Sequence, residues 1–322
     1  MKKLLLASSA LVASAGVASA EISWSGYAEM GIAGGTNQDA QFHQDIALSF
    51  SMSGTTDNGI EFGASSDFDT DSGAGGSING TWNLDNESVF IKGGFGTLTL
   101  GEIDGAMDWA LTEAGNVGNP GSLNDDETAH GGYQGSYLDG QYDNQIARYD
   151  HTIGDFGFAI SAEMDDTGAR DPGYAIGAKY SMALGMGSLD LAAGYQSTDE
   201  TGSPIKTFTA APGEDVTVAG LSAVFAMDNG LSAGVNYTDW EIGTQDATHT
   251  GIGVGYSMDA ITLHANWGQY DFDGQGDVTG WGVAAAYNLG GGATMHLGYG
   301  DTDDEIAGTE SDRWSFGLSM KF

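Results

Sequence analysis

The chain has 322 residues, with 45 Asp and Glu against nine Lys and Arg, and a formal net charge of −36 at pH 7. Such a surface repels nucleic acid phosphates, and the absence of cysteine excludes disulfides, thiolate metal sites and thiol catalysis. The 53 glycines would suit a disordered chain, but the 10% aromatic content and the regular patterning indicate a folded one.

The first twenty residues have the features of a secretory signal. Lys2 and Lys3 precede an apolar run, and residues 18–20 form a small-residue cleavage site. A short buried helix is the alternative interpretation. Cleavage near Ala20 would leave residues 21–322 as a single domain and move the formal charge from −36 to −38, because the two lysines leave. No later run of 18 apolar residues predicts a membrane helix, so the exported chain is expected in the periplasm, the outer membrane or the medium.

The rest of the chain alternates between large apolar residues and small or polar ones. Clear examples are 156–164, 174–182, 231–238, 261–267 and 281–289. A period of two is typical of strands, and no helical period competes with it. Short turns rich in Gly, Asn and Asp are expected at 57–59, 93–96, 154–155, 185–187, 228–230, 259 and 290–292. Longer polar connections are expected at about 34–40, 70–86, 103–143, 165–173, 197–215, 241–249, 271–277 and 301–311. This arrangement predicts sixteen strands of about 9 to 14 residues.

The last strand, residues 313–322, indicates what these faces meet. Its even positions carry large apolar side chains up to a terminal Phe322, and its odd positions are polar or small. Strand length and alternating turn length match a membrane barrel, which must close because unpaired backbone groups are costly in lipid. We therefore predict an all-β fold: a 16-stranded antiparallel transmembrane β-barrel with a water-filled lumen, short periplasmic turns and long external loops. The aromatic residues expected to form girdles at the membrane interfaces are Trp24, Tyr195, Tyr256, Trp267, Tyr299 and Phe322.

Several segments, taken in order, resemble the general diffusion porins of alphaproteobacteria, as in the Rhodobacter type. They are the signal, "EISWSGYAEMGIAGG" from Glu21, "GTLTLGEIDGAMD" from Gly96, "NQIARYD" from Asn144 and the terminal Phe322. The resemblance covers essentially the whole mature chain. It implies a homotrimer in the Gram-negative outer membrane and an inward-folded third loop. It also implies that Phe322 is part of the assembly signal read by the barrel-assembly machinery.

The third loop, about residues 103–143, is where function is expected to concentrate. It carries no Lys or Arg, and its acids are Asp104, Asp108, Glu113, Asp125, Asp126, Glu127, Asp139 and Asp143. The resemblance implies that such acids face basic residues on the barrel wall. Here the basic candidates are Lys92, Arg148 and His43; alternation places Lys92 and His43 inward and leaves Arg148 undecided. The excess of acids predicts a cation-selective channel for small hydrophilic solutes, although each acid has solvation on the outer face of the loop as an alternative.

Two acidic clusters offer hard oxygen ligands for calcium or magnesium. They are Asp125, Asp126 and Glu127 in the third loop, and Asp301, Asp303, Asp304 and Glu305 near the end of the chain. Bound divalent ions would tie loops together or bridge to lipopolysaccharide phosphates. Solvated loop charge is the alternative for each residue. No cofactor is required by any other motif.

Enzyme function is not predicted. Residues 230–234 match the G-x-S-x-G pattern of a hydrolase, but a strand pattern follows where the hydrolase needs a helix. His264 and His296 are expected to line the lumen. Two other functions stay open: an acidic, calcium-binding secreted or surface β-protein of the adhesin kind, and a solute-specific outer-membrane channel.

Overall fold

A computed structural model describes residues 21–36, 38–69, 83–123, 128–142, 145–165, 167–199 and 214–322. The predicted signal, residues 1–20, lies outside these ranges, and so do the third-loop acids Asp125, Asp126, Glu127 and Asp143.

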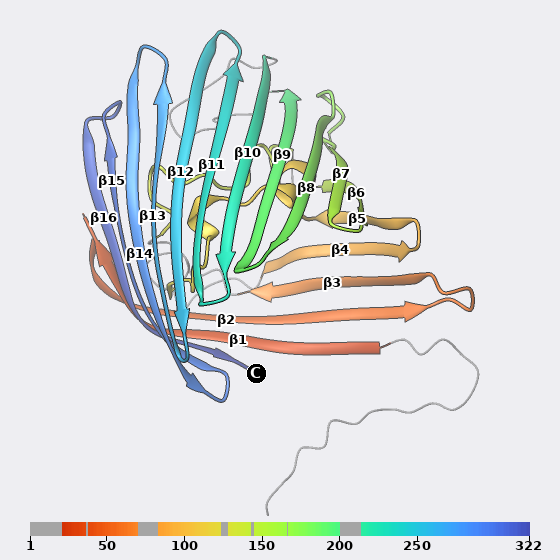
Figure 1. Ribbon diagram of the computed structural model, residues 1–322, viewed down its shortest axis with the longest axis horizontal. Helices are drawn as coiled ribbons and strands as arrows, with labels where there is room; N and C mark the ends of the chain where they lie inside the picture. Colours follow the sequence, from red (N-terminus) through yellow and green to blue (C-terminus); the bar gives the residue numbers. More distant parts are fainter. Residues whose placement is uncertain are drawn as a thin grey trace, which may run out of the picture.

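Sixteen antiparallel strands in the described residues form one closed barrel, in which each strand pairs with its neighbours in chain order (Figure 1). The predicted fold is thereby confirmed. The strands are β1 Glu21–Gly35, β2 Gln38–Thr55, β3 Glu61–Asp69, β4 Asn83–Gly93, β5 Gly96–Glu102, β6 Gln145–Ile153, β7 Phe156–Glu163, β8 Gly173–Leu184, β9 Gly187–Asp199, β10 Asp215–Met227, β11 Leu231–Ile242, β12 Gln245–Met258, β13 Ile261–Phe272, β14 Gly276–Gly290, β15 Ala293–Asp304 and β16 Thr309–Lys321. Among the described residues between β5 and β6, α1 Ala106–Ala110 and η1 Ala114–Asn116 form short helices. In the described chain, no helix combines the length and the apolar character needed to cross a membrane.

The first and last strands close the barrel. Along the β1–β16 ladder Gly31 pairs with Gly317, and the pairing reaches the end of the chain. The Phe322 N–H donates to the Gly26 carbonyl at 2.8 Å, and the Gly26 N–H donates to the Phe322 carbonyl at 3.2 Å. Closure satisfies the backbone groups that an open sheet edge would leave unpaired.

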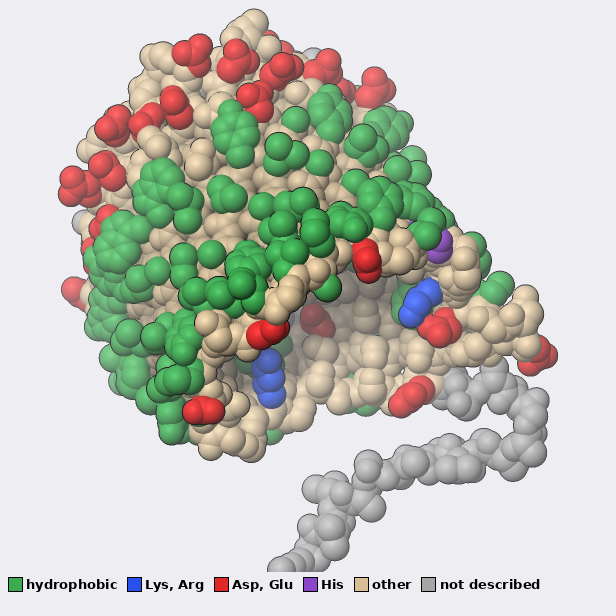
Figure 2. Space-filling view, in the orientation of Figure 1, with side chains coloured by type: hydrophobic (Ala, Val, Ile, Leu, Met, Phe, Trp, Pro, Cys, Tyr) green, Lys and Arg blue, Asp and Glu red, His purple; other side chains and the backbone are tan. Residues whose placement is uncertain are grey.

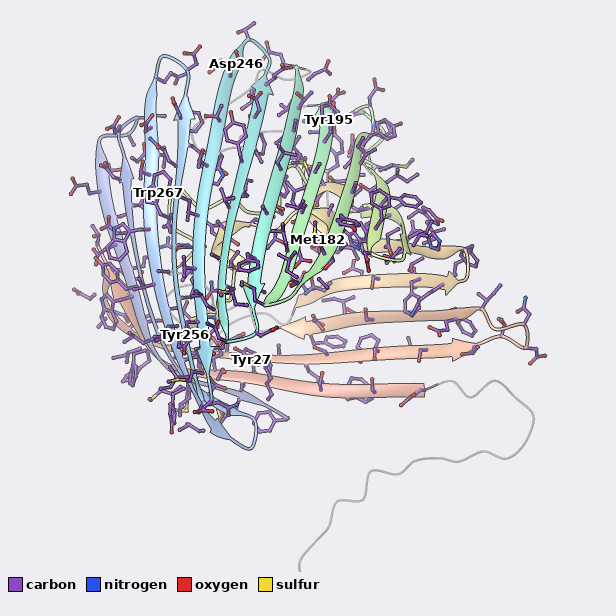
Figure 3. The ribbon with its side chains drawn as sticks, viewed as in Figure 1. Tyr27, Met182, Tyr195, Asp246, Tyr256 and Trp267 are labelled. Carbon is purple, nitrogen blue, oxygen red and sulfur yellow. The ribbon has the colours of Figure 1, made fainter. Side chains whose placement is uncertain are left out.

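The wall has the sidedness that the alternation predicts. On β16 the Phe316 side chain points outward and is 44% exposed, whereas Ser315 and Ser319 point inward and are buried. Apolar side chains form a broad band over the outer wall, and acidic side chains gather beyond it (Figure 2). Tyr195 and Tyr256 lie near opposite ends of the strands, as two aromatic girdles require (Figure 3). The outer face of the band therefore suits lipid, and the inner face suits water.

Beyond the band, at the end of the long loops, the alternation inverts. On β11 Tyr237 is the last outward apolar residue, and the next outward side chains are Asp239 and Glu241. Between them Trp240 and Ile242 point inward and are 1% and 0% exposed. We call the buried residues at this level the inner apolar cluster; from the wall it comprises Val216, Val218, Trp240, Ile242, Ala247, Tyr270, Phe272 and Val278, and from the third loop Tyr137 and Leu138. This part of the wall has the sidedness of a water-soluble β-protein.

Four predicted loops are too long, and the inversion explains two of them. Residues 241–249 and 271–277 were expected to be polar connections, yet β11 and β12 are joined by residues 243–244 alone, and β13 and β14 by 273–275. The connection expected at 34–40 is likewise shorter, because β1 runs to Gly35 and β2 begins at Gln38. The connection expected at 301–311 begins later, because β15 ends at Asp304. On β11–β14 the outward acids resemble loop residues, although the strands continue with their apolar side chains turned inward. At the β1–β2 end Phe42 is instead 86% exposed, so the inversion does not account for that extension. β2 reaches 18 residues, while β5 has only seven.

The connection between β5 and β6, residues 103–144, is the third loop. Its described residues fold into the barrel behind β10–β13, as predicted (Figure 1). The helix α1 is short and buries Ala106, Met107 and Ala110 against the wall. The loop therefore lies where it can narrow the lumen.

Candidate pore constriction

The third loop is seated on a row of inward-facing glycines of the wall. A Cβ atom on Gly177 would lie 1.9 Å from the Ala106 carbonyl oxygen, and one on Gly253 would lie 1.8 Å from the Ala114 carbonyl oxygen. We call this row the glycine belt; it comprises Gly177, Gly194, Gly220, Gly234, Gly253, Gly255, Gly268, Gly280 and Gly317. Only glycine lets the loop backbone approach the wall this closely. The belt fixes the loop against β8–β16.

Wall side chains accept hydrogen bonds from the loop backbone. The Ala106 N–H donates to Ser161 Oγ at 2.8 Å, and the Ala114 N–H donates to Asn236 Oδ1 at 2.9 Å. Further loop N–H groups bonded in this way include those of Thr112 to Ser222 Oγ, Gly131 to Thr302 Oγ1, Leu138 to Gln196 Oε1 and Tyr142 to Glu163 Oε1. These bonds satisfy backbone groups that would otherwise be buried without a partner.

Three wall histidines supply the opposite half of this docking. His249 Nε2 lies 2.8 Å from the Gly132 carbonyl oxygen, His264 Nδ1 2.9 Å from that of Val117, and His296 Nδ1 3.0 Å from that of Gly121. Because a carbonyl oxygen can only accept, each of these nitrogens carries the proton. The lumen position predicted for His264 and His296 is correct, and their contacts are with the loop.

Two loop acids, Asp108 and Glu113, face each other in a buried site. Burial raises the pKa of the Asp108 carboxyl to about 9, and the charge of Glu113 adds to the shift. Burial also raises the pKa of Glu113, although Asn116 Nδ2 donates to its Oε2 at 3.0 Å. The other carboxylate oxygen, Oε1, is buried and has no hydrogen-bond partner among the residues that the structure describes. Near neutral pH this pair therefore holds less negative charge than two exposed acids would.

Asp139 ties the beginning of the loop to its end and to the wall. Its Oδ2 accepts from the Gly105 N–H at 2.6 Å, and its Oδ1 accepts from Gln196 Nε2 at 2.7 Å. Burial raises the pKa of Asp139 to about 7, against the effect of these two hydrogen bonds. Asp104, one residue before Gly105, is exposed at the loop entrance.

Arg148 faces the lumen, which the sequence left undecided. It lies opposite Ser161, an inward residue, and its Nε donates to Asp150 Oδ1 at 3.3 Å. Its Nη1 donates to the Asp104 carbonyl oxygen at 2.5 Å. The guanidinium thus holds the loop entrance to β6.

Lys179 on β8 is a second basic residue that contacts the third loop. The basic cluster predicted from the sequence did not include it. Its Nζ donates to the Trp109 carbonyl oxygen at 2.9 Å and lies 3.5 Å from the centroid of the Trp109 ring. Alternation alone could have found it, because Lys179 occupies the small-residue face of its strand.

The other two basic candidates point inward but lie apart from these groups. Lys92, at the short-turn end of β4, is exposed and pairs with Glu61 at 3.3 Å. His43 on β2 is buried, and its Nε2 lies 3.0 Å from Glu29 Oε2. The structure therefore brings Arg148 and Lys179 to the third loop, and leaves Lys92 and His43 with partners on neighbouring strands.

The candidate calcium ligands near the end of the chain alternate across the wall. Asp301 and Asp303 follow the outward residue Tyr299 on β15, Asp304 takes the opposite face, and Glu305 lies in the turn. Within the described ranges no group of three or more His, Asp and Glu residues is arranged to hold a metal ion.

Comparison with known proteins identifies the family. The Gram-negative porin family matches residues 7–307. The chain belongs to this family. It is 29% identical to a porin of Rhodobacter capsulatus over 94% of this chain and 100% of that one. A porin structure refined at 1.8 Å resolution superposes with a TM-score of 0.72 at 24% identity, and a mutant of the Rh. blastica porin with 0.67 at 17% identity. Each covers 94% of this chain and 100% of its own.

Membership resolves several sequence predictions. The porin is a transmembrane β-barrel channel of the Gram-negative outer membrane. The family consists of channels and not of enzymes. The G-x-S-x-G segment forms the beginning of β11, where Ser232 Oγ donates to the Gly255 carbonyl oxygen at 3.4 Å. The adhesin-like alternative is wrong, because the Gram-negative porin family matches residues 7–307 of the chain.

Proposed function

We propose that this porin forms a water-filled, cation-selective channel for the passive diffusion of small hydrophilic solutes and ions. The observation that carries the selectivity is the chemistry of the third loop, which has eight acids and no Lys or Arg. The constriction would lie between this loop and the wall, with Asp104, Asp108, Glu113, Asp125, Asp126 and Glu127 on the loop side.

The basic residues at the loop support a net negative constriction. Arg148 and Lys179 both donate to loop carbonyl oxygens, and Arg148 also pairs with Asp150. The Asp150 carboxylate offsets the charge of Arg148, whereas a carbonyl partner is neutral and leaves the charge of Lys179 in place. The acids of the third loop still outnumber the uncompensated cations. Low-dielectric walls focus the remaining negative potential and raise the local concentration of cations.

The test is single-channel recording in planar bilayers across a KCl gradient. The reversal potential should show cation preference, and neutralising Asp125, Asp126 and Glu127 together should lower it. Neutralising three outward acids, Asp239, Glu241 and Asp271, removes the same charge from the outer face and serves as the matched control. Because salt screens exposed charges over about 8 Å at physiological ionic strength, the control should leave selectivity unchanged. Anion preference would reject the negative constriction, and absence of conductance would reject the open pore.

The remaining expectations concern biogenesis and assembly. We propose that residues 1–20 are removed as a signal near Ala20, and that residues 21–322 form the mature domain. We also propose that the barrel assembles as a homotrimer and that its outer rim contacts lipopolysaccharide. In this proposal the acidic loops bind calcium as a structural ion, and the barrel-assembly machinery recognises Phe322. Mass spectrometry of the native protein in detergent tests the signal cleavage and the homotrimer directly.

A further inference from the structure

A pocket of about 410 Å³ opens on the lumen beneath α1, on the side of the short turns. The turn between β6 and β7, Gly154 and Asp155, forms part of its rim. The polar side chains that line it include Trp109 and Thr112 of the third loop, and Lys179, Ser181, Asp190 and Ser222 on the inward faces of β8–β10. Thr152 of β6 and the Asp155 carboxylate complete the lining near the turn. The pocket is therefore reached from the water-filled lumen.

The positive charge of the pocket is held in a fixed place. Lys179 Nζ donates one hydrogen bond to the Trp109 carbonyl at 2.9 Å and lies 3.5 Å from the centroid of the Trp109 ring. An ammonium group has three donors, so Lys179 retains capacity to bind a solute carboxylate. The nearby charges of Arg148 and Asp150 pair with each other at 3.3 Å.

The negative charge lies next to it on the same face of the wall. Lys179 pairs with Ala192, and Ser181 pairs with Asp190, which makes Lys179 and Asp190 diagonal neighbours about 7–8 Å apart along the strands. Ser181 Oγ donates to Asp190 Oδ1 at 2.5 Å and orients the carboxylate. Lys179 and Asp190 both lie in the described part of the chain, and they do not form an ion pair with each other. The pocket thus presents opposite charges at Lys179 and Asp190 with a gap between them, and Asp155 adds a second carboxylate at the rim.

We propose that this pocket is a binding site for small zwitterionic solutes of the α-amino acid class. The solute carboxylate binds Lys179, and the solute ammonium binds Asp190. A solute with one charge meets attraction at one group and repulsion at the other, whereas a zwitterion is complementary to both. Binding is weak, because a channel site must release its solute. The inference rests on the proposed pore, since a solute reaches the pocket only through the lumen.

The experiment measures solute flux into proteoliposomes against concentration. Four solutes share one skeleton: L-alanine is zwitterionic, N-acetyl-L-alanine anionic, L-alaninamide cationic and lactamide neutral. We expect alanine flux to saturate and the other three to rise linearly. Lys179→Gln and Asp190→Asn should each raise the half-saturating alanine concentration by about tenfold or more, because each removes a charged hydrogen-bonding partner. Lactamide flux is measured in every variant and corrects each alanine curve for a change in pore width, because Lys179 also contacts Trp109 of the third loop.

Two control variants carry the same charge changes outside the pocket. Lys321→Gln matches Lys179→Gln, and Asp239→Asn, on the outer face, matches Asp190→Asn; both should leave alanine saturation unchanged. Linear alanine flux beside normal lactamide flux would overturn the zwitterion site and leave the pore intact. Saturation by N-acetylalanine that survives Asp190→Asn would overturn it in favour of a simple anion site. Absence of lactamide flux would overturn the proposed pore itself.

Discussion

Adding a single methyl group at Gly253 tests how the third loop is held. In Gly253→Ala the new Cβ would lie 1.8 Å from the Ala114 carbonyl oxygen, whereas carbon and oxygen atoms in contact lie about 3.3 Å apart. The loop backbone must therefore move about 1.5 Å away from β12 and into the lumen. Overpacking and the lost bond between the Ala114 N–H and Asn236 Oδ1 together weaken docking by about 2 to 4 kcal/mol.

The assay is single-channel conductance in planar bilayers, with heat-induced unfolding followed on gels. We expect lower and noisier conductance with little change in barrel unfolding, because the ladder between Gly253 and its partners Gly234 and Asn266 is untouched. Gly185→Ala is the control, since a Cβ atom there has no neighbour within 4 Å. A Gly253→Ala channel that matches both the control and the wild type would refute the docking argument.

Three further predictions concern charge, packing and assembly. Raising the pH from 6 to 9 should increase cation preference, measured as reversal potential, because Asp139 (pKa about 7) and then Asp108 (pKa about 9) ionise. The same ionisation should weaken loop docking between pH 4 and 9, because burial favours the protonated form of both acids. Faster hydrogen exchange in the loop would report this weakening. Asp108→Asn should reduce both pH effects. Trp240→Ala should destabilise the barrel by about 3–5 kcal/mol, measured by denaturant unfolding in detergent, whereas outward Thr217→Ala should cost little. Deleting Phe322 should lower the yield of folded barrel in outer-membrane fractions.

Much of the barrel is predictable because a period of two describes both its walls and its sidedness. Apolar rows such as Phe316 and Leu318 identify the outer face, and turns such as 228–230 identify the short-turn end. The same rule fails beyond the membrane level, where Trp240 and Ile242 turn inward. There the strand period persists but its polarity reverses, and a search for outward apolar residues mistakes such strands for loops.

The constriction is less predictable, because its contacts join distant parts of the chain. The acids of the third loop are visible in the sequence, but the burial of Asp108 and Glu113 depends on how the loop is seated. Its seating depends on glycines spread from Gly177 to Gly317, each of which looks like an ordinary small lumen residue. Lys179 was visible on the inward face, yet its contact with Trp109 follows only from the folded loop.

The point at which the wall reverses its polarity also sets how deeply the protein sits in its membrane. On β11 the change occurs between Tyr237 and Asp239, over a single step of the outward face. Moving the barrel outward or inward by one such step would put a carboxylate into hydrocarbon or an aromatic ring into water. The vertical position is thus specified residue by residue, and a bilayer of different thickness has to deform around the barrel, because the barrel cannot slide to match it.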